Sequence, residues 1–218
     1  MAPPLHVLGT AGALALDLLG ELIAPSRCAA CDAALRRRSV FCAACAATVE
    51  RPTEEDGACV AAFEYGGAIA TAIGRLKYED RADLAPRLAG AMEPAARRFE
   101  GTVDVVVPVP LHPRRLAARG YNQAALLAAP IAHVLGVSSR VGALVRVRDT
   151  PQQVRMDRAR RRINVVGAFA AREALTSGER VLLVDDVRTT GATLDGCSRA
   201  LREAGAREVR ALVLARRA

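Results

Sequence analysis

The segment from Val181 to Leu194 constrains the fold of this chain more than any other part of its sequence. It opens with four consecutive apolar residues, a pattern typical of a strand that is buried on both faces. Two acids, Asp185 and Asp186, follow at the carboxyl end of this strand, and the small-residue turn Thr189-Thr190-Gly191 comes next. A helix is expected from Thr193 onward. This order indicates an α/β fold with a ligand site at the end of a strand.

The turn in this segment has the chemistry of an anion site. Its backbone N–H groups and hydroxyls can surround a phosphate, and the start of the helix adds partial positive charge. Gly191 allows the backbone to approach the anion closely. The predicted phosphate contacts are Arg188, Thr189, Thr190, Gly191, Ala192 and Thr193.

The paired acids distinguish this site from one for bare phosphate. Carboxylates accept hydrogen bonds from two ribose hydroxyls, directly or through water molecules on Mg²⁺. A phosphate on one side and Asp185 and Asp186 on the other therefore predict a 5-phosphorylated ribose, with 5-phosphoribosyl-1-pyrophosphate (PRPP) and Mg²⁺ as the expected ligand. A Walker A loop would need a Gly-Lys-Ser/Thr ending, which the segment lacks. A structural turn without a ligand stays the alternative, although paired aspartates have little packing purpose.

The rest of the main domain alternates between strand and helix patterns. Such alternation predicts a mostly parallel sheet with helices on both faces. The expected strands are Ala58–Tyr65, Val103–Val107, Val141–Val147, Val181–Asp185 and Glu208–Ala215, and the expected helices are Ile69–Lys77, Asp83–Arg98, Asn122–Leu135 and Thr193–Ala204.

Four cysteines form two CxxC pairs near the amino terminus, Cys28/Cys31 and Cys42/Cys45. Two such pairs complete the tetrahedral sulfur shell that Zn²⁺ prefers, and a closed shell indicates a structural role. Redox CxxC motifs or a pair of disulfides are the alternatives. The polar stretch Pro52–Gly57 marks a boundary, so residues 1–57 are expected to form a helix and zinc ribbon, and residues 58–218 the main domain.

The amino-terminal stretch Leu5–Ile23 is apolar, but it has no Lys or Arg ahead of it and contains Asp17 and Glu21. It predicts an amphipathic helix with no membrane span, in a cytoplasmic protein. The formal charge of +8 favours anionic partners. Aromatic residues make up only 3% of the chain, so a stacking platform for single-stranded nucleic acid is poorly supplied.

Beyond these local patterns, the sequence resembles the ComF family of competence-associated, phosphoribosyltransferase-like proteins over nearly its full length. The motifs that carry the resemblance, besides the cysteine pairs and Val181–Leu194, are Arg75-Leu-Lys-Tyr78, Val107-Pro-Val-Pro-Leu-His112, Arg119-Gly-Tyr-Asn-Gln-Ala124, Thr150-Pro-Gln-Gln153 and Asn164-Val-Val-Gly-Ala-Phe169. The resemblance implies a type I phosphoribosyltransferase fold, Rossmann-like, with PRPP bound at Asp185 and Asp186 as the catalytic acids.

The resemblance also implies roles for other loops. The loop at Pro108–Leu111 matches the pyrophosphate loop, with Pro108, Val109 and Arg119 as candidate contacts. Lys77 either contacts pyrophosphate or lies on the surface. The basic segment Arg148–Arg162 resembles a loop that closes over the ligand, with Gln152, Arg155 and Arg160 as candidate contacts, or else it forms a nucleic-acid arm.

Two functions from different classes fit these expectations. The first is a phosphoribosyltransferase that displaces pyrophosphate from PRPP, with an acceptor that no motif identifies. The second is a non-catalytic competence factor of the same fold that binds single-stranded DNA or DNA-processing proteins during DNA uptake. A PRPP-sensing regulator shares the site of the first.

Overall fold

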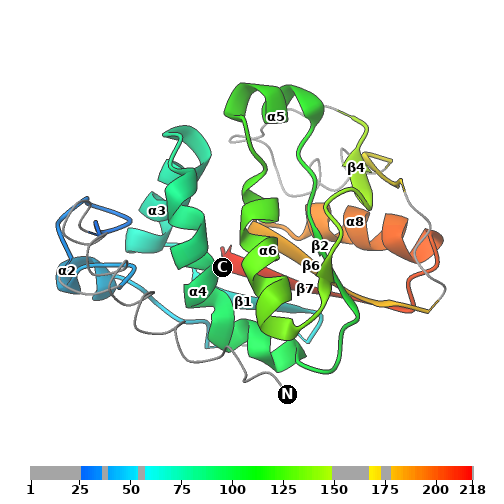
Figure 1. Cartoon of the computed structure of the whole chain (residues 1–218), viewed down its shortest axis with the longest axis horizontal. Helices are drawn as coiled ribbons and strands as arrows, with labels where there is room; N and C mark the ends of the chain where they lie inside the picture. The colour runs from blue at the N-terminus through cyan, green and yellow to red at the C-terminus, as the bar shows by residue number, and fades with distance from the viewer. Residues whose placement is uncertain (1–25, 36–38, 54–56, 149–166, 173–177, 218) are drawn as a thin grey trace, which may run out of the picture.

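In the computed structural model, residues 26–35, 39–53, 57–148, 167–172 and 178–217 are described, and their core is a five-stranded sheet. The strand order is β1-β7-β6-β2-β3, and every neighbouring pair is parallel. The strands are β1 (Cys59–Glu64), β2 (Val105–Pro108), β3 (Ser138–Ser139), β6 (Arg180–Arg188) and β7 (Glu208–Arg216). The predicted α/β fold is thus confirmed (Figure 1).

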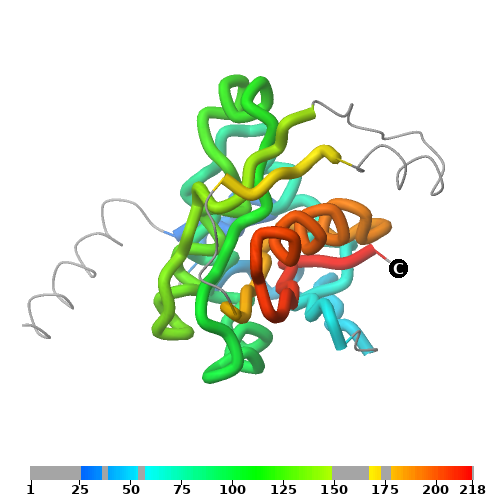
Figure 2. Tube along the Cα trace, turned by 90° about the vertical axis from the view of Figure 1, so that its right-hand side faces the viewer, coloured from blue at the N-terminus to red at the C-terminus, as the bar shows by residue number. Residues whose placement is uncertain are grey.

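Helices cover both faces of this sheet (Figures 1 and 2). Three helices lie on one face: α3 (Gly67–Tyr78), α4 (Ala85–Ala96) and α6 (Gln123–Leu135). Helix α8 (Ala192–Glu203) packs on the other face. Two short helices, α2 (Ala43–Ala46) and α5 (Pro113–Arg119), and two 3₁₀ turns, η1 (Ala82–Leu84) and η2 (Arg97–Phe99), complete the described helical elements.

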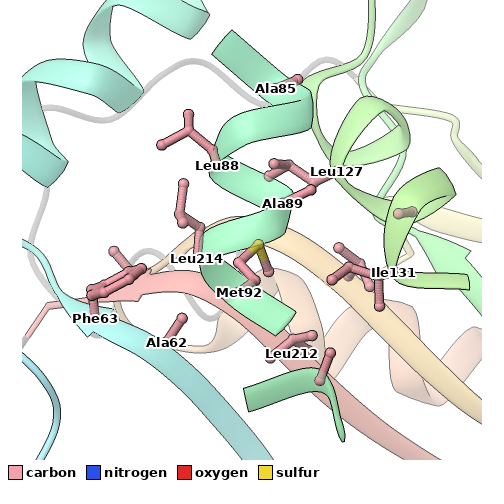
Figure 3. Close-up of a cluster of buried hydrophobic side chains, with 14 of the residues drawn as sticks. Ala62, Phe63, Ala85, Leu88, Ala89, Met92, Leu127, Ile131, Leu212 and Leu214 are labelled. Atoms are coloured by element: carbon pink, nitrogen blue, oxygen red, sulfur yellow. The ribbon is translucent and has the colours of Figure 1, made fainter. Parts of the chain in front are cut away.

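The side chains of β6 alternate between two hydrophobic clusters. Leu182 and Val184 join the cluster under α4 and α6, whereas Val181 and Leu183 join the cluster under α8. Leu182 and Leu183 are both fully buried, and burial of a side chain of this size contributes about 1.5–3 kcal/mol. Figure 3 shows the first cluster, where Met92 of α4 and Ile131 of α6 meet the sheet. A strand buried on both faces explains the continuous apolar run.

One predicted strand lies elsewhere than expected. Only Leu144–Arg146 of the stretch Val141–Val147 is a strand (β4), and it pairs antiparallel with β5 (Phe169–Ala171), outside the main sheet. The fifth position of the sheet belongs to β3, whose two serines carry no apolar signal. The Arg140 N–H donates to the Val106 carbonyl at 2.9 Å, and a turn then directs the chain away from the sheet.

Several expectations stay predictions. The amino-terminal helix, Gln152, Arg155 and Arg160 lie outside the described residues. The boundary at residue 57 also stays a prediction. Among the described helices, none is long and apolar enough to cross a membrane.

The start of α3 packs tightly on the cysteine-containing segment. Gly67 has φ +45°, and a Cβ atom at this position would lie 2.4 Å from the carbonyl oxygen of Thr48. The Thr48 hydroxyl accepts a hydrogen bond from the Ala68 N–H at 2.9 Å. Only glycine therefore fits where the chain passes from β1 into α3.

We predict that Gly67→Ala lowers the free energy of unfolding by about 2 kcal/mol or more, because it adds backbone strain to a steric overlap. Gly66→Ala is the matched control: Gly66 is extended, with φ −169°, and a Cβ atom there has nothing within 4 Å. Chemical denaturation of both variants measures the difference. Equal stabilities for the two variants would contradict the close approach of Thr48.

Candidate functional site

The candidate site lies where β2 and β6 pair at the centre of the sheet. In the sheet, β3 is the outer neighbour of β2 and β7 is the outer neighbour of β6. The strand order therefore runs in opposite directions from this pair. Pro108 is in register with Val184, and the Val109 N–H donates to the Val184 carbonyl at 2.9 Å. Ligands of parallel α/β sheets bind beyond the carboxyl ends of strands at such a point.

Asp185 and Asp186 end the buried part of β6 and point to opposite faces of the sheet. Asp185 continues the row of Leu183 toward α8, and Asp186 continues the row of Val184 toward α3. Their exposed fractions are only 7% and 3%. The Asp186 N–H donates to Asp185 Oδ1 at 2.8 Å. Two carboxylates therefore flank the end of one strand, one on each side.

Lys77 supplies the counter-charge on the α3 side. Its Nζ lies 2.7 Å from Asp186 Oδ2. Burial lowers the pKa of Lys77, but the negative charges of Asp186 and Asp185 outweigh this effect and raise it overall. Lys77 was predicted near the pyrophosphate or on the surface; the structure places its ammonium against one of the two acids.

Asp185 lies in a different electrostatic setting. Burial, followed by the charge of Asp186, raises the pKa of Asp185 well above its usual value, although Lys77 opposes the shift. On the α8 side, burial and the charge of Asp185 raise the pKa of the Cys197 thiol. Cys197 is therefore a protonated packing residue, as buried cysteines usually are.

The turn between β6 and α8 has the geometry expected of an anion site. Gly191 has φ +80° and stands at the cap position of α8, and as a glycine it has no side chain to accept a hydrogen bond from the first turn. A Cβ atom at Gly191 would lie 3.6 Å from Arg188 Nε. The end of β6, the turn and the start of α8 hold the predicted phosphate contacts, which are Arg188, Thr189, Thr190, Gly191, Ala192 and Thr193.

A groove of about 510 Å³ extends from this turn along α8. At the turn, the groove is lined by Arg188, Thr190 and Gly191. Ser198, Arg199 and Arg202 of α8 line its length, and the two arginines are exposed. Residues 195, 198, 199 and 202 lie on one face of the helix because they are three or four positions apart.

The loop after β2 is held by the start of α6. The Asn122 side chain donates to the Val109 carbonyl at 3.0 Å and accepts from the Ala124 N–H at 3.0 Å. Asn122 is thus a helix cap that also fixes the predicted pyrophosphate loop at Pro108 and Val109. His112 caps α5 in a similar way, because its Nδ1 accepts from the Arg114 N–H at 3.3 Å.

The end of α3 contacts the segment between α5 and α6. The Tyr121 hydroxyl donates to the Leu76 carbonyl at 2.6 Å, and the Arg119 guanidinium lies 5.7 Å from the centre of the Tyr78 ring. Arg119 also donates to the Gln123 side chain. Tyr78 and Tyr121 were not predicted to hold the site together, although both lie within the quoted motifs.

The four amino-terminal cysteines converge on one point. Their sulfur atoms all lie within 4.8 Å of one another, and the Cys31 and Cys42 Sγ atoms are 3.7 Å apart. A tetrahedral zinc–thiolate shell with bonds of about 2.3 Å has sulfur–sulfur edges of about 3.8 Å. Cys28, Cys31, Cys42 and Cys45 could therefore hold a metal such as zinc.

The surroundings of these thiols differ. Burial raises the pKa of Cys28, but N–H groups of Cys42, Cys31 and Ala30 outweigh it and lower the pKa to about 6. The pKa of Cys45 is raised to about 12 by burial and by the neighbouring cysteine side chains. N–H groups directed at Cys28 stabilise its thiolate, which is the form that binds metal.

Two arginines, one from α3 and one from α4, fasten the cysteine-containing segment to these helices. Arg75 of α3 is buried; it forms an ion pair with Asp32 and donates to the Ala29 carbonyl at 3.2 Å. The hydrogen bond from Arg75 holds the pKa of Asp32 below its usual value. Arg87 of α4 donates to the carbonyls of Arg27 at 2.6 Å and Val40 at 3.0 Å.

Known proteins resemble this chain in sequence. Residues 96–218 match the phosphoribosyl transferase domain family. The chain is 34% identical to the DNA utilization protein YhgH of Salmonella typhi over 162 residues, which cover 72% of this chain and 71% of that protein. It is 35% identical to competence protein F of Haemophilus influenzae over 153 residues, 66% of each chain. The chain also aligns with a solved purine phosphoribosyltransferase from Pyrococcus horikoshii at 22% identity, with a TM-score of 0.39, over 61% of this chain and 73% of that chain.

We predict that the purified chain contains about one zinc ion, and that Cys28→Ser loses it because the sulfur shell is then incomplete. Cys59→Ala, which changes a buried cysteine of β1, should keep the metal. Metal analysis measures the content, and limited proteolysis measures the order of residues 26–50. Zinc loss without faster cleavage would contradict a structural role.

Proposed function

Because this chain belongs to the phosphoribosyl transferase domain family, we propose that it binds PRPP with Mg²⁺ at the carboxyl ends of β2 and β6 and acts as a phosphoribosyltransferase. One observation carries the proposal: two buried carboxylates at the end of β6 lie beside the glycine-capped start of α8. This juxtaposition offers hydrogen-bond acceptors and donors a few residues apart, as a ribose phosphate requires.

Each part of the ligand has a matching group in the proposed complex. The 5-phosphate accepts hydrogen bonds from the N–H groups and hydroxyls of residues 188–193. The ribose hydroxyls donate to Asp185 and Asp186. The pyrophosphate lies toward Val109, with Arg119 as the proposed cationic donor.

The proposed reaction transfers the ribose from pyrophosphate to an acceptor. The bond between C1 and the pyrophosphate oxygen breaks, and the pyrophosphate keeps the electron pair. The acceptor nucleophile bonds to C1 and loses a proton. Mg²⁺, when bound, neutralises charge on the leaving pyrophosphate. Asp185 and Asp186 hold the sugar and face the positive charge that develops on it.

A second function, binding of single-stranded DNA, is favoured by the groove along α8. Its exposed Arg199 and Arg202 line the same groove as Arg188 and could contact successive backbone phosphates. The relatives named for DNA utilization and competence are consistent with a role in DNA handling, which identifies a process and not a reaction. The two functions are compatible, because the groove starts at the phosphate turn and runs away from the paired acids.

We predict that the wild-type chain releases or absorbs heat on titration with PRPP and Mg²⁺, and that Asp186→Asn weakens binding by about tenfold or more, because a hydrogen bond to a charged group is worth about 1.5–3 kcal/mol. Glu100→Gln is the control, since Glu100 lies at the opposite end of the sheet, before β2. Thermal unfolding verifies that each variant is folded. Absence of PRPP binding by the wild type would refute the proposal.

For the second function, we predict that Arg199→Ala and Arg202→Ala each reduce the slope of log affinity against log salt for single-stranded DNA by about 1. Arg97→Ala is the matched control, because Arg97 is an exposed arginine that follows α4, away from the groove. If the two groove variants keep the wild-type slope, DNA does not bind along α8.

A further inference from the structure

Lys77 is the single lysine of the chain, and its position is unusual for that residue. It lies in the last turn of α3, and its side chain is only 19% exposed. The adjacent Leu76 is fully buried, and the Tyr121 hydroxyl holds the Leu76 carbonyl at 2.6 Å. The backbone that carries Lys77 is therefore fixed, and its ammonium is directed at Asp186 Oδ2.

This placement has a consequence for metal binding at the same carboxylate. A magnesium ion binds a carboxylate oxygen at about 2.0–2.1 Å, so an ion on Asp186 Oδ2 would lie about 4 Å from the ammonium. The two like charges would repel in a site with little water to screen them. The ammonium thus occupies the position where a free divalent ion would otherwise be attracted.

We propose that Lys77 is the resident cation of the ribose site, and that it excludes a free divalent metal ion from Asp186, so that metal enters the site only in complex with the phosphates of the ligand. The inference rests on the proposed ribose-phosphate site, but it concerns the unliganded protein and its test needs no PRPP.

The same contact explains how Asp186 can serve the sugar. The ammonium lies 2.7 Å from this carboxylate, and a carboxylate is a pure acceptor with about four lone-pair positions. Lys77 forms an ion pair at Oδ2, and the remaining acceptor positions of the carboxylate suit donors such as ribose hydroxyls. Asp185 lies on the other side of the strand, where burial and the charge of Asp186 raise its pKa. Lys77 is therefore a positioning residue that acts through Asp186.

The test is binding of Mn²⁺ alone to the zinc-loaded full chain, measured by electron paramagnetic resonance. Wild type and Lys77→Arg, which keeps the positive charge, should bind no more Mn²⁺ than the double variant Lys77→Met/Asp186→Asn. Lys77→Met removes the cation and leaves both acids, so it should gain one site at least tenfold tighter. A folded Lys77→Met that gains no Mn²⁺ site would overturn the proposal.

A second measurement decides the matter even if Lys77→Met fails to fold. Because the chain has one lysine, labelling with lysine carrying ¹³C at Cε gives a single lysine signal. That signal should move in Asp186→Asn and should not broaden when Mn²⁺ is added to the wild type. Broadening by Mn²⁺ at concentrations that leave the double variant unoccupied would place a free metal ion beside Lys77 and refute its exclusion. Failure to bind PRPP would refute the proposed function and leave these readouts unaffected.

Discussion

The contact between Lys77 and Asp186 completes a path of charged interactions that starts at the cysteine cluster. Arg75 and Lys77 lie two positions apart on α3, about 200° around the helix, and so face opposite sides. Arg75 binds Asp32 and the Ala29 carbonyl in the cysteine segment, whereas Lys77 binds the acidic end of β6. One helix thus fixes the cysteine segment and the candidate ligand site relative to each other, and the geometry of the site depends on where α3 lies.

Burial of these charges favours a unique arrangement more than it adds stability. A buried ion pair gains little net free energy, because desolvation offsets the attraction, but removal of one partner leaves an uncompensated charge and costs about 3–5 kcal/mol. Lys77 and Asp186 are both largely buried, so neither can be displaced without that cost. A shift of α3 would break the contact of Lys77 with Asp186 and the contact of Arg75 with Asp32. The position of the cysteine cluster is therefore coupled to the geometry of the site through α3.

The local parts of this architecture could be predicted from the sequence, and the long-range contacts could not. The apolar run, acids and turn of β6 are contiguous, so periodicity and composition sufficed for the strand and the turn into α8, and the spacing of the cysteines sufficed for their cluster. Lys77 and Asp186 lie far apart in the sequence, and a lysine near a helix end usually extends to solvent, so its pairing carried no signal. The two serines of β3 lack the apolar pattern that marks an inner strand, which is why Val141–Val147 was assigned to the sheet in their place.

The two ends of the candidate site also explain what kind of molecule it can accept. N–H donors at the start of α8 favour an anion there, whereas the acceptor oxygens of Asp185 and Asp186 at the end of β6 favour hydroxyl donors. A bare phosphate gains from the first group only, and an uncharged sugar gains from the second only. A ligand gains from both when its phosphate is separated from neutral hydroxyls by a few bonds. In the proposed complex, Asp186 beside Lys77 accepts from sugar hydroxyls and the start of α8 receives the phosphate, so a ligand that carries both groups fits the site better than either group alone.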